Sequence, residues 1–166
     1  MNGLHEYRVG VEWRGNRGTG TSGYRDYGRE LLIHAANKEP LEGSADPTFH
    51  GNAERWNPEE LLVAALAQCH MLSYLHMAVR EGVVVTGYTD EATGTMQQRG
   101  LGGAFTEVVL RPRVTVADVS MVEAARAAHA EAREHCFIAN SVNFPVRHEP
   151  EIVVAGPEND SDSSPL

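Results

Sequence analysis

The centre of the chain reads Asn57-Pro58-Glu59-Glu60-Leu61-Leu62-Val63-Ala64-Ala65-Leu66-Ala67-Gln68-Cys69-His70-Met71, and it begins as a helix begins. Asn57 can act as an N-cap, and the proline that follows suits the first helical position. Glu59 and Glu60 place negative charge at the positive end of the helix dipole. No helix breaker follows before about Arg80, and Gly82 is placed to end the helix. The stretch therefore predicts one long helix.

This predicted helix is apolar on nearly every side. Between residues 61 and 78 its clearly polar positions are few, namely Gln68, His70, Ser73 and His76. A helix that is apolar all round is buried all round. One small antiparallel sheet covers only one of its faces, so the simplest source of the missing cover is a second copy of the chain. The sequence therefore predicts a homodimer.

The composition indicates a soluble globular protein. The chain has 166 residues, enough for one domain with a core, and 42% of them are hydrophobic. A net charge of −9 without any basic run argues against a nucleic-acid partner. No apolar N-terminal segment resembles a signal peptide, and the long helix has too many polar residues to span a membrane comfortably. We therefore expect a cytoplasmic protein, in which two cysteines are more often catalytic or metal-binding than disulfide-bonded.

Local patterns predict strands and one further helix. The alanine-rich stretch 124–133 reads as a second helix that starts at the capping box Ser120-x-x-Glu123 and ends near Cys136. Residues 37–56, rich in proline, glycine and charge, read as a long surface loop. Strands are predicted at 4–13, 30–35, 83–98, 104–116 (bent by Pro112) and 151–154.

The order of these elements favours an α+β fold. Strands and helices alternate as ββ–α–ββ–α–β, which suggests antiparallel sheets packed on helices. We expect a single domain over residues 1–155. Residues 156–166 are polar and acidic, and they are predicted to be a disordered tail.

Two motifs of the chain resemble those of a known family. The central helix, Asn57-Pro58-Glu59-Glu60-Leu61-Leu62 followed by Ala64-Ala65 and Cys69, is similar to the hallmark helix of the OsmC/Ohr family. A second cysteine, Cys136, follows at the end of a predicted helix. The Gly-Tyr-Arg-Asp stretch at residues 23–26 resembles an element of the organic hydroperoxide resistance branch. The resemblance extends in layout over about residues 5–155 and departs at Phe137, where many members have proline.

The resemblance implies a fold and an activity. The fold is an OsmC-like one, with antiparallel sheets around a buried central helix in an intertwined homodimer. The activity is that of an antioxidant thiol peroxidase, which reduces organic hydroperoxides in the stress response. Cys69 is then the peroxidatic cysteine, and Cys136 resolves its sulfenic acid to a redox-active disulfide. An external dithiol, with lipoylated proteins, thioredoxin and small thiols all open, reduces that disulfide, and no cofactor is implied.

Cys69 needs help to react as a thiolate. Burial in an apolar helix raises a thiol pKa, and the middle of a helix offers no dipole end to lower it. An arginine suits an apolar site better than a lysine as the required cation. By the resemblance this cation is Arg25, and Glu59 holds the arginine in place.

Helix geometry adds a condition on these two partners of the arginine. Glu59 and Cys69 are ten residues apart, which is about 15 Å along the axis and roughly 80° around it. Only a fully stretched arginine would bridge them within one chain. If one arginine contacts both closely, we expect Glu59 to come from an antiparallel partner helix.

Each candidate also has a purely structural interpretation. A cysteine in a buried helix is usually a small hydrophobe. Glu59 can serve only the helix dipole, a role for which Glu60 competes. Arg17 and Arg29 are rivals of Arg25 for the role of the cation.

Other chemistries fit the sequence less well. A zinc site can be assembled on paper from Cys69-His70, His76, His135-Cys136 and His148, but the spacings are not those of zinc fingers. We therefore predict no bound metal. A Cys–His hydrolase built on Cys69 and His135 lacks any sign of an oxyanion hole or an orienting acid.

The alternative of a different class is a non-catalytic, OsmC-like stress protein that binds a hydrophobic ligand. Both functions need an apolar pocket beside Cys69, and its candidate residues are Leu66, Met71, Leu72, Tyr74 and Phe144. In a peroxidase, such a pocket favours bulky organic peroxides over hydrogen peroxide. The two functions differ in whether Cys69 reacts rapidly with a hydroperoxide.

Overall fold

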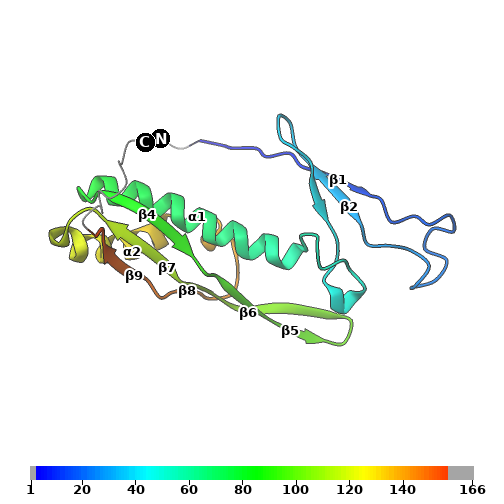
Figure 1. The fold of residues 1–166 in the computed structure, drawn as a ribbon. Helices are drawn as coiled ribbons and strands as arrows, with labels where there is room; N and C mark the ends of the chain where they lie inside the picture. The colour runs from blue at the N-terminus through cyan, green and yellow to red at the C-terminus, as the bar shows by residue number, and fades with distance from the viewer. Residues whose placement is uncertain (1–2, 157–166) are drawn as a thin grey trace, which may run out of the picture. The chain divides into compact units, whose positions relative to one another are not determined.

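The structure is a computed structural model that describes residues 3–156 (Figure 1). These residues form two compact units that divide after residue 62. The α+β class predicted from the sequence is confirmed. The prediction of a single domain over 1–155 stays a prediction, and the predicted disordered tail lies, from residue 157 on, outside the described residues.

The first unit is built on a three-stranded antiparallel sheet in the order β1-β2-β3. Its strands are β1 (Gly10–Trp13), β2 (Leu31–His34) and β3 (Leu41–Gly43), and a short 3₁₀ turn, η1 (Pro47–Phe49), follows. The predicted first strand was too long, since only its last four residues pair. β3 was missed, because it lies in a stretch whose prolines and charges favoured a loop.

The loop between β1 and β2 is closed by a pair of glycines. Gly28 N donates to Gly15 O over 2.8 Å, and a Cβ on Gly15 would lie 1.9 Å from Gly28 O. No side chain larger than hydrogen fits at that approach. The indole Nε1 of Trp13 also donates to Gly28 O, at 2.9 Å, so the base of the loop is tied to the end of β1.

The long helix α1 (Pro58–Arg80) begins and ends where the sequence predicts. Asn57 Oδ1 accepts from Glu60 N at 2.8 Å, and Glu60 Oε2 accepts from Asn57 N at 3.3 Å. This reciprocal capping box satisfies two backbone donors at the start of the helix. Gly82, at φ +71°, takes the left-handed conformation that ends it.

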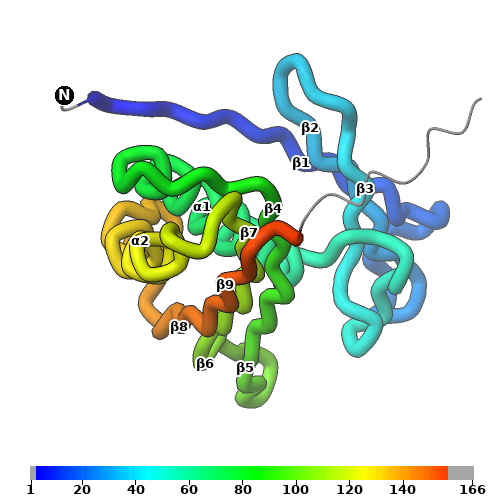
Figure 2. Tube along the Cα trace, turned by 60° about the vertical axis from the view of Figure 1, so that its left-hand side comes forward, coloured from blue at the N-terminus to red at the C-terminus, as the bar shows by residue number. Residues whose placement is uncertain are grey.

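The second unit contains two helices and two three-stranded sheets. One sheet has the order β4-β7-β9, from β4 (Val85–Asp90), β7 (Pro112–Val116) and β9 (Glu151–Val154). The other has the order β5-β6-β8, from β5 (Thr93–Arg99), β6 (Gly102–Leu110) and β8 (Val146–His148). The helix α2 (Val122–His135) lies beside α1 on the same side of β4, β7 and β9 (Figure 2).

Two strand pairs differ from the antiparallel sheets that the sequence predicted. β8 runs parallel to β6, and β9 runs parallel to β7. Both pairings join segments far apart in the chain, which local patterns do not encode. The last strand itself, at 151–154, is confirmed to the residue.

The predicted capping box ahead of α2 is wrong. Ser120 lies in a 3₁₀ turn, η2 (Val119–Met121), and both its N and its Oγ donate to Asp118 Oδ1. Asp118 is thus the capping residue, and it caps the short turn. α2 starts directly from that turn at Val122, with no side-chain cap.

The core of the second unit lies between the helices and β7. Alanines of α2 and larger side chains of α1 share this core. The buried members of this core are Tyr74, Met77 and Ala78 of α1, Val83, Val114 and Val116 of the strand region, and Ala125, Ala128 and Ala132 of α2.

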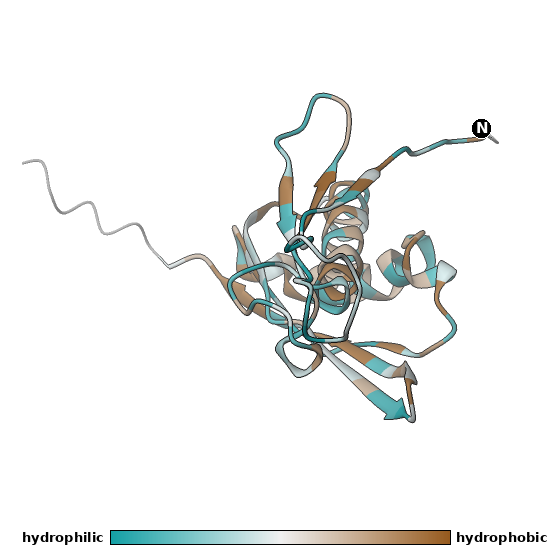
Figure 3. Cartoon of the chain, turned by 90° about the vertical axis from the view of Figure 1, so that its right-hand side faces the viewer, coloured by the Kyte–Doolittle hydropathy of each residue, from teal (hydrophilic) through white to brown (hydrophobic). Residues whose placement is uncertain are grey.

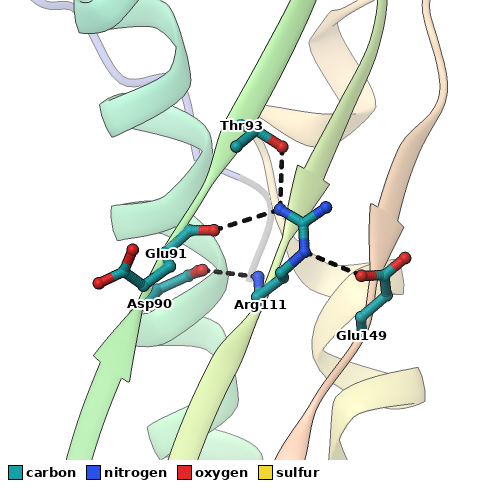
Figure 4. Close-up of polar contacts among 5 residues, drawn as sticks. All are labelled: Asp90, Glu91, Thr93, Arg111 and Glu149. Carbon is teal, nitrogen blue, oxygen red and sulfur yellow. Dashed lines mark hydrogen bonds and ion pairs between the residues drawn. The ribbon is translucent and has the colours of Figure 1, made fainter.

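Arg111 joins the strands at the point where β6 gives way to β7 (Figure 4). Its backbone N donates to Asp90 Oδ1 at 2.7 Å, and its Nε donates to Glu149 Oε2 at 2.9 Å. Its Nη1 donates to Thr93 Oγ1 at 2.9 Å and more weakly to Glu91 O at 3.5 Å. One side chain therefore ties the β4–β5 connection to the segment after β8.

We expect Arg111→Met to lower the free energy of unfolding by about 1–2 kcal/mol, because it removes several charge-assisted bonds at once. The matched control is Arg113→Met, which removes one exposed ion pair to Glu151 at 3.1 Å. That change should cost about 0.5 kcal/mol or less. Urea denaturation of the three proteins measures both, and equal losses would contradict a special role for Arg111.

Candidate functional site

The structure brings the two cysteines together. Cys69 lies in the middle of α1 and is half-buried, whereas Cys136 directly follows α2 and is 1% exposed. Both thiols are free, and they lie close enough together for Cys69 to contribute to the raised pKa of Cys136. Two residues 67 positions apart in the sequence thus form one thiol pair at the end of α2.

Burial, and to a smaller extent the neighbouring Cys69, raises the pKa of the Cys136 thiol to about 11. Cys136 is therefore a protonated thiol at neutral pH. A thiol in that state is a poor nucleophile towards a peroxide, but it can donate a hydrogen bond to the sulfur beside it. The two sulfurs of the pair differ in burial, because Cys136 is almost fully buried and Cys69 is only half-buried.

The segment after Cys136 is a compact turn. Asn140 N donates to Cys136 O at 3.0 Å, and Ser141 Oγ donates to Phe137 O at 2.7 Å. Phe137, which stands where many family members have proline, is 77% exposed. Ser73, one turn after Cys69 on α1, donates from its Oγ to His135 O at 3.5 Å. The turn is therefore closed by its own hydrogen bonds without a proline.

The two glutamates at the start of α1 have separate roles. Glu60 is occupied by the capping box with Asn57. Glu59 is half-buried, and its Oε2 is inaccessible to solvent and has no hydrogen-bond partner among the described residues. A buried carboxylate oxygen requires a cation or a donor. Glu59, and not Glu60, is thus the carboxylate available to an arginine.

Arg25 sits at the tip of a tight turn in the first unit. Asp26 N donates to Gly23 O at 3.0 Å, so Tyr24 and Arg25 occupy the central positions of that turn. Arg25 is exposed, and its guanidinium makes no hydrogen bond or ion pair with any residue from 3 to 156. Its rival Arg29 is different, because both its terminal nitrogens bond to backbone carbonyls.

The predicted apolar pocket is partly wrong. Tyr74 is fully buried in the core, where its hydroxyl donates to Ala125 O at 3.1 Å, so it is not free to contact a ligand. Leu66 is also completely buried. Leu72 is 57% exposed, and Phe144 packs on Phe105 at 5.4 Å between ring centroids. Leu72, Phe144 and Met71 stay predicted ligand contacts.

Two of the histidines considered for a zinc site or a hydrolase lie at the surface. His76 and His135 are exposed, and His135 Nδ1 bonds to Glu131 O at 2.8 Å. Across residues 3–156, no group of three or more His, Cys, Asp or Glu side chains has the geometry to hold a metal ion.

The structure contains a buried cluster of histidines that the sequence did not predict. His70 of α1 and His129 of α2 are almost fully buried, and His70 Nε2 lies 3.0 Å from His129 Nδ1. His148 of β8 packs on His70 with ring centroids 4.1 Å apart, and Tyr74 stacks on His129 at 4.0 Å. The sequence places His70 and Tyr74 one turn apart on the same face of the long helix, which is a sign that they share surroundings. Nothing local in the sequence marks His129 as buried.

These imidazoles are neutral in the folded protein. Burial, helped by the neighbouring imidazoles, lowers the pKa of His70 to about 3, and burial, helped by His148 and Arg126, lowers that of His129 to about 4. Burial and Arg133 lower the pKa of His148 to about 4. The outer ring nitrogens His70 Nδ1, His129 Nε2 and His148 Nε2 have no partner among the described residues. No carboxylate there supports a positive charge.

The cluster predicts that the protein loses stability in mild acid. Because the folded-state pKa values lie below the ordinary 6.5, the unfolded chain binds protons first as the pH falls. The stabilisation is complete above pH 6.5 and is lost progressively down to about pH 4. His70 and His129 should each account for about 2 kcal/mol of lost stability at pH 5. Urea denaturation at pH 7, 6 and 5 measures the slope.

Two variants isolate the cluster from other acid effects. His129→Gln keeps a polar partner for His70 but cannot be protonated, so it should lose less stability between pH 7 and pH 5 than the wild type. His76→Gln removes an exposed histidine from the same helix and should leave the slope unchanged. A slope that is identical in all three proteins would contradict the assignment.

Fold and site together define a class of α+β proteins in which a long apolar helix carries one cysteine and the end of a second helix brings another to it. A sequence profile of the OsmC-like protein family matches residues 51–151. The chain belongs to the OsmC-like family. Comparison with curated proteins finds no match.

Solved structures share this fold over nearly the whole chain. An OsmC-like protein of unknown function from Vibrio cholerae is 31% identical, with a TM-score of 0.79 over 89% of this chain and 99% of that one. An organic hydroperoxide resistance protein from Elizabethkingia anophelis, with thiocyanate bound, is 17% identical, with a TM-score of 0.66 over 93% and 100%. An organic hydroperoxide resistance protein from Legionella pneumophila is 16% identical, with a TM-score of 0.62 over 92% and 100%. At these last two identities, the likeness is one of fold.

Proposed function

We propose that the protein is a cysteine-based peroxidase that reduces organic hydroperoxides to alcohols in the cytoplasm. The observation that carries the proposal is the pair of neighbouring free cysteines, Cys69 and Cys136, in which Cys136 is buried and held as the thiol. Structures of the same fold include organic hydroperoxide resistance proteins, which supports a role in peroxide stress. In this proposal Cys69 is the peroxidatic cysteine and Cys136 is the resolving one.

The proposed cycle balances with one peroxide and one dithiol. The Cys69 thiolate attacks the outer oxygen of the hydroperoxide, the O–O bond breaks, and the departing alkoxide takes a proton to become an alcohol. The sulfur of Cys136 then displaces hydroxide from the Cys69 sulfenic acid, and the Cys136 proton leaves with that hydroxide as water. An external dithiol reduces the resulting disulfide by exchange. A lipoylated protein, thioredoxin or a small thiol has the required chemistry.

The proposal gives Arg25 and Glu59 supporting roles. Arg25 stabilises the Cys69 thiolate and polarises the peroxide. Its guanidinium is available for this role because it is exposed and has no polar partner among the described residues. Glu59 orients the arginine, and its unpartnered buried oxygen is the group that needs such a cation. Following the helix geometry, Glu59 acts from the partner subunit.

We also propose that the protein works as a homodimer. Within residues 3–62 no hydrophobic side chain is buried, and Leu4 and Tyr7 are 92% and 87% exposed. By its length and its composition alone, α1 could cross a membrane, but the core helices of soluble proteins meet the same two criteria. Its hydrophobic residues, brown in Figure 3, lie on several sides, and Val79 is 77% exposed. A second copy of the chain is the simplest cover for both surfaces.

The two-cysteine cycle predicts a rapid loss of thiols. One equivalent of cumene hydroperoxide should remove both free thiols of the reduced wild type at once, because the first sulfenic acid condenses with the neighbouring Cys136. In Cys136→Ser, the Cys69 sulfenic acid should persist and react with a sulfenate-specific probe. Thiol titration and mass spectrometry measure both results.

Cys69→Ser is the control for this experiment and should consume no peroxide, because the remaining thiol has its pKa raised to about 11. If both wild-type thiols are still free after minutes, the protein is not a peroxidase. Saturable binding of a hydrophobic ligand that survives Cys69→Ser would then identify the non-catalytic stress protein.

The homodimer predicts a native mass of twice the 18.1 kDa chain at micromolar concentration. Sedimentation equilibrium measures this mass directly. Val79→Arg places a charge on the exposed apolar surface of α1 and should weaken the dimer. Arg80→Ala, at the neighbouring exposed position, is the matched control and should leave the mass unchanged. A monomeric wild type would contradict the proposal.

A further inference from the structure

The turn that carries Arg25 is held by more than its own backbone bond. Asp26 N closes the turn onto Gly23 O, and Ser22 Oγ donates to Asp26 Oδ2 at 2.9 Å. The turn nevertheless projects from a long loop, between β1 and β2, whose hydrophobic side chains are not buried. Something else must keep the peptides on either side of Arg25 in place.

Arg29 makes four contacts to this turn. Its Nη2 donates to Tyr24 O at 2.7 Å, and that carbonyl belongs to the peptide bond that joins Tyr24 to Arg25. Its Nη1 donates to Tyr27 O at 2.6 Å. Its guanidinium carbon also lies 4.6 Å from the ring centroid of Tyr24 and 4.1 Å from that of Tyr27. Both ends of the Tyr24–Tyr27 segment are therefore bound to one half-buried guanidinium.

We propose that Arg29 is a positioning residue, whose guanidinium fork fixes the turn so that Arg25 projects in one direction. The inference rests on the proposed function, in which Arg25 acts on the Cys69 thiolate. A planar fork with donors at fixed angles can satisfy two carbonyls and pack on two rings at once, which the single ammonium of lysine cannot do. The shape of Arg29, and not only its charge, is what the turn requires.

The contacts of the Tyr24 and Tyr27 rings support a positioning role for Arg29. The ring of Tyr27 meets Trp13 edge to face at 6.0 Å, and the ring of Tyr24 meets His50 at 5.3 Å. The two rings that pack on the Arg29 guanidinium are thus themselves in contact with β1 and with the end of η1. Arg29 and the two tyrosine rings are thus held by contacts within residues 3–62, whereas the Arg25 guanidinium has no polar contact with any residue from 3 to 156.

A double-mutant cycle tests the proposal through Cys69. The rate constant of Cys69 with cumene hydroperoxide, and the pH midpoint of its alkylation, are measured in wild type, Arg25→Met, Arg29→Met, Arg29→Lys and the double variant Arg25→Met/Arg29→Met. We expect both single Arg29 variants to slow the reaction about tenfold or more and to raise the alkylation midpoint, as a misplaced catalytic cation would. In the Arg25→Met background, Arg29→Met should have no further effect, because Arg29 acts through Arg25.

Hydrogen exchange tests whether Arg29 stabilises the turn, independently of any reaction of Cys69. The Asp26 amide should exchange about tenfold faster in Arg29→Met, while the amides paired between β1 and β2 stay protected. Arg14→Met is the matched control, since Arg14 is an arginine of the same loop whose guanidinium pairs with Glu12 at 2.8 Å and does not contact the turn, and it should change neither measurement.

The possible results separate this inference from the proposed function. If Arg25→Met slows Cys69 and Arg29→Met does not, or if the two effects simply add, Arg29 does not position Arg25 and the inference is overturned. If Arg25→Met leaves the Cys69 reaction unchanged, the proposed role of Arg25 is wrong and the inference fails with it. If Arg29→Lys keeps the wild-type rate, charge and not the fork is sufficient, which also overturns the inference.

Discussion

The structure depends on one helix that a single chain does not cover. α1 buries only one stripe against the core, formed by Leu66, His70, Tyr74, Met77 and Ala78. Its remaining apolar residues, such as Leu72 and Val79, are exposed. The burial of apolar surface is the dominant favourable contribution to folding and to most association, so a helix of this composition favours an arrangement that covers its other sides. The proposed homodimer would provide that cover.

The same constraint sets the chemistry of the thiols. In the middle of α1, Cys69 is far from either helix end, so no helix dipole supports a thiolate there. Cys136 is held nearby by the end of α2, where burial keeps it protonated. In the proposed cycle, the charge that stabilises a Cys69 thiolate therefore comes from a residue outside its own helix. In residues 3–62, Arg25 is a guanidinium that no polar contact occupies.

The sequence predicted best where the signal is local and strong. The start of α1 at Asn57, its end at Gly82 and the strand at 151–154 are all set by residues within a few positions. The parallel pairing of β8 with β6 was missed because register between distant strands is decided by packing. The thiol pair could be predicted only through the family resemblance, since nothing in the spacing of Cys69 and Cys136 places α2 against α1. His129 was overlooked for the same reason.

Residues 3–62 show how a turn can be precise without a hydrophobic core. Each hydrogen bond of this unit is worth only about 1 kcal/mol net, so the unit needs apolar cover to be stable as a whole. The geometry around Arg25 nevertheless depends on bonds with short reach: Trp13 to Gly28, Gly28 to Gly15 and Arg29 to the two tyrosine carbonyls. These bonds define the shape of the turn, while burial of the exposed Leu4, Tyr7 and Val11 would supply its stability. Because the two tasks fall on different residues, the turn around Arg25 can keep its shape whatever covers these exposed side chains.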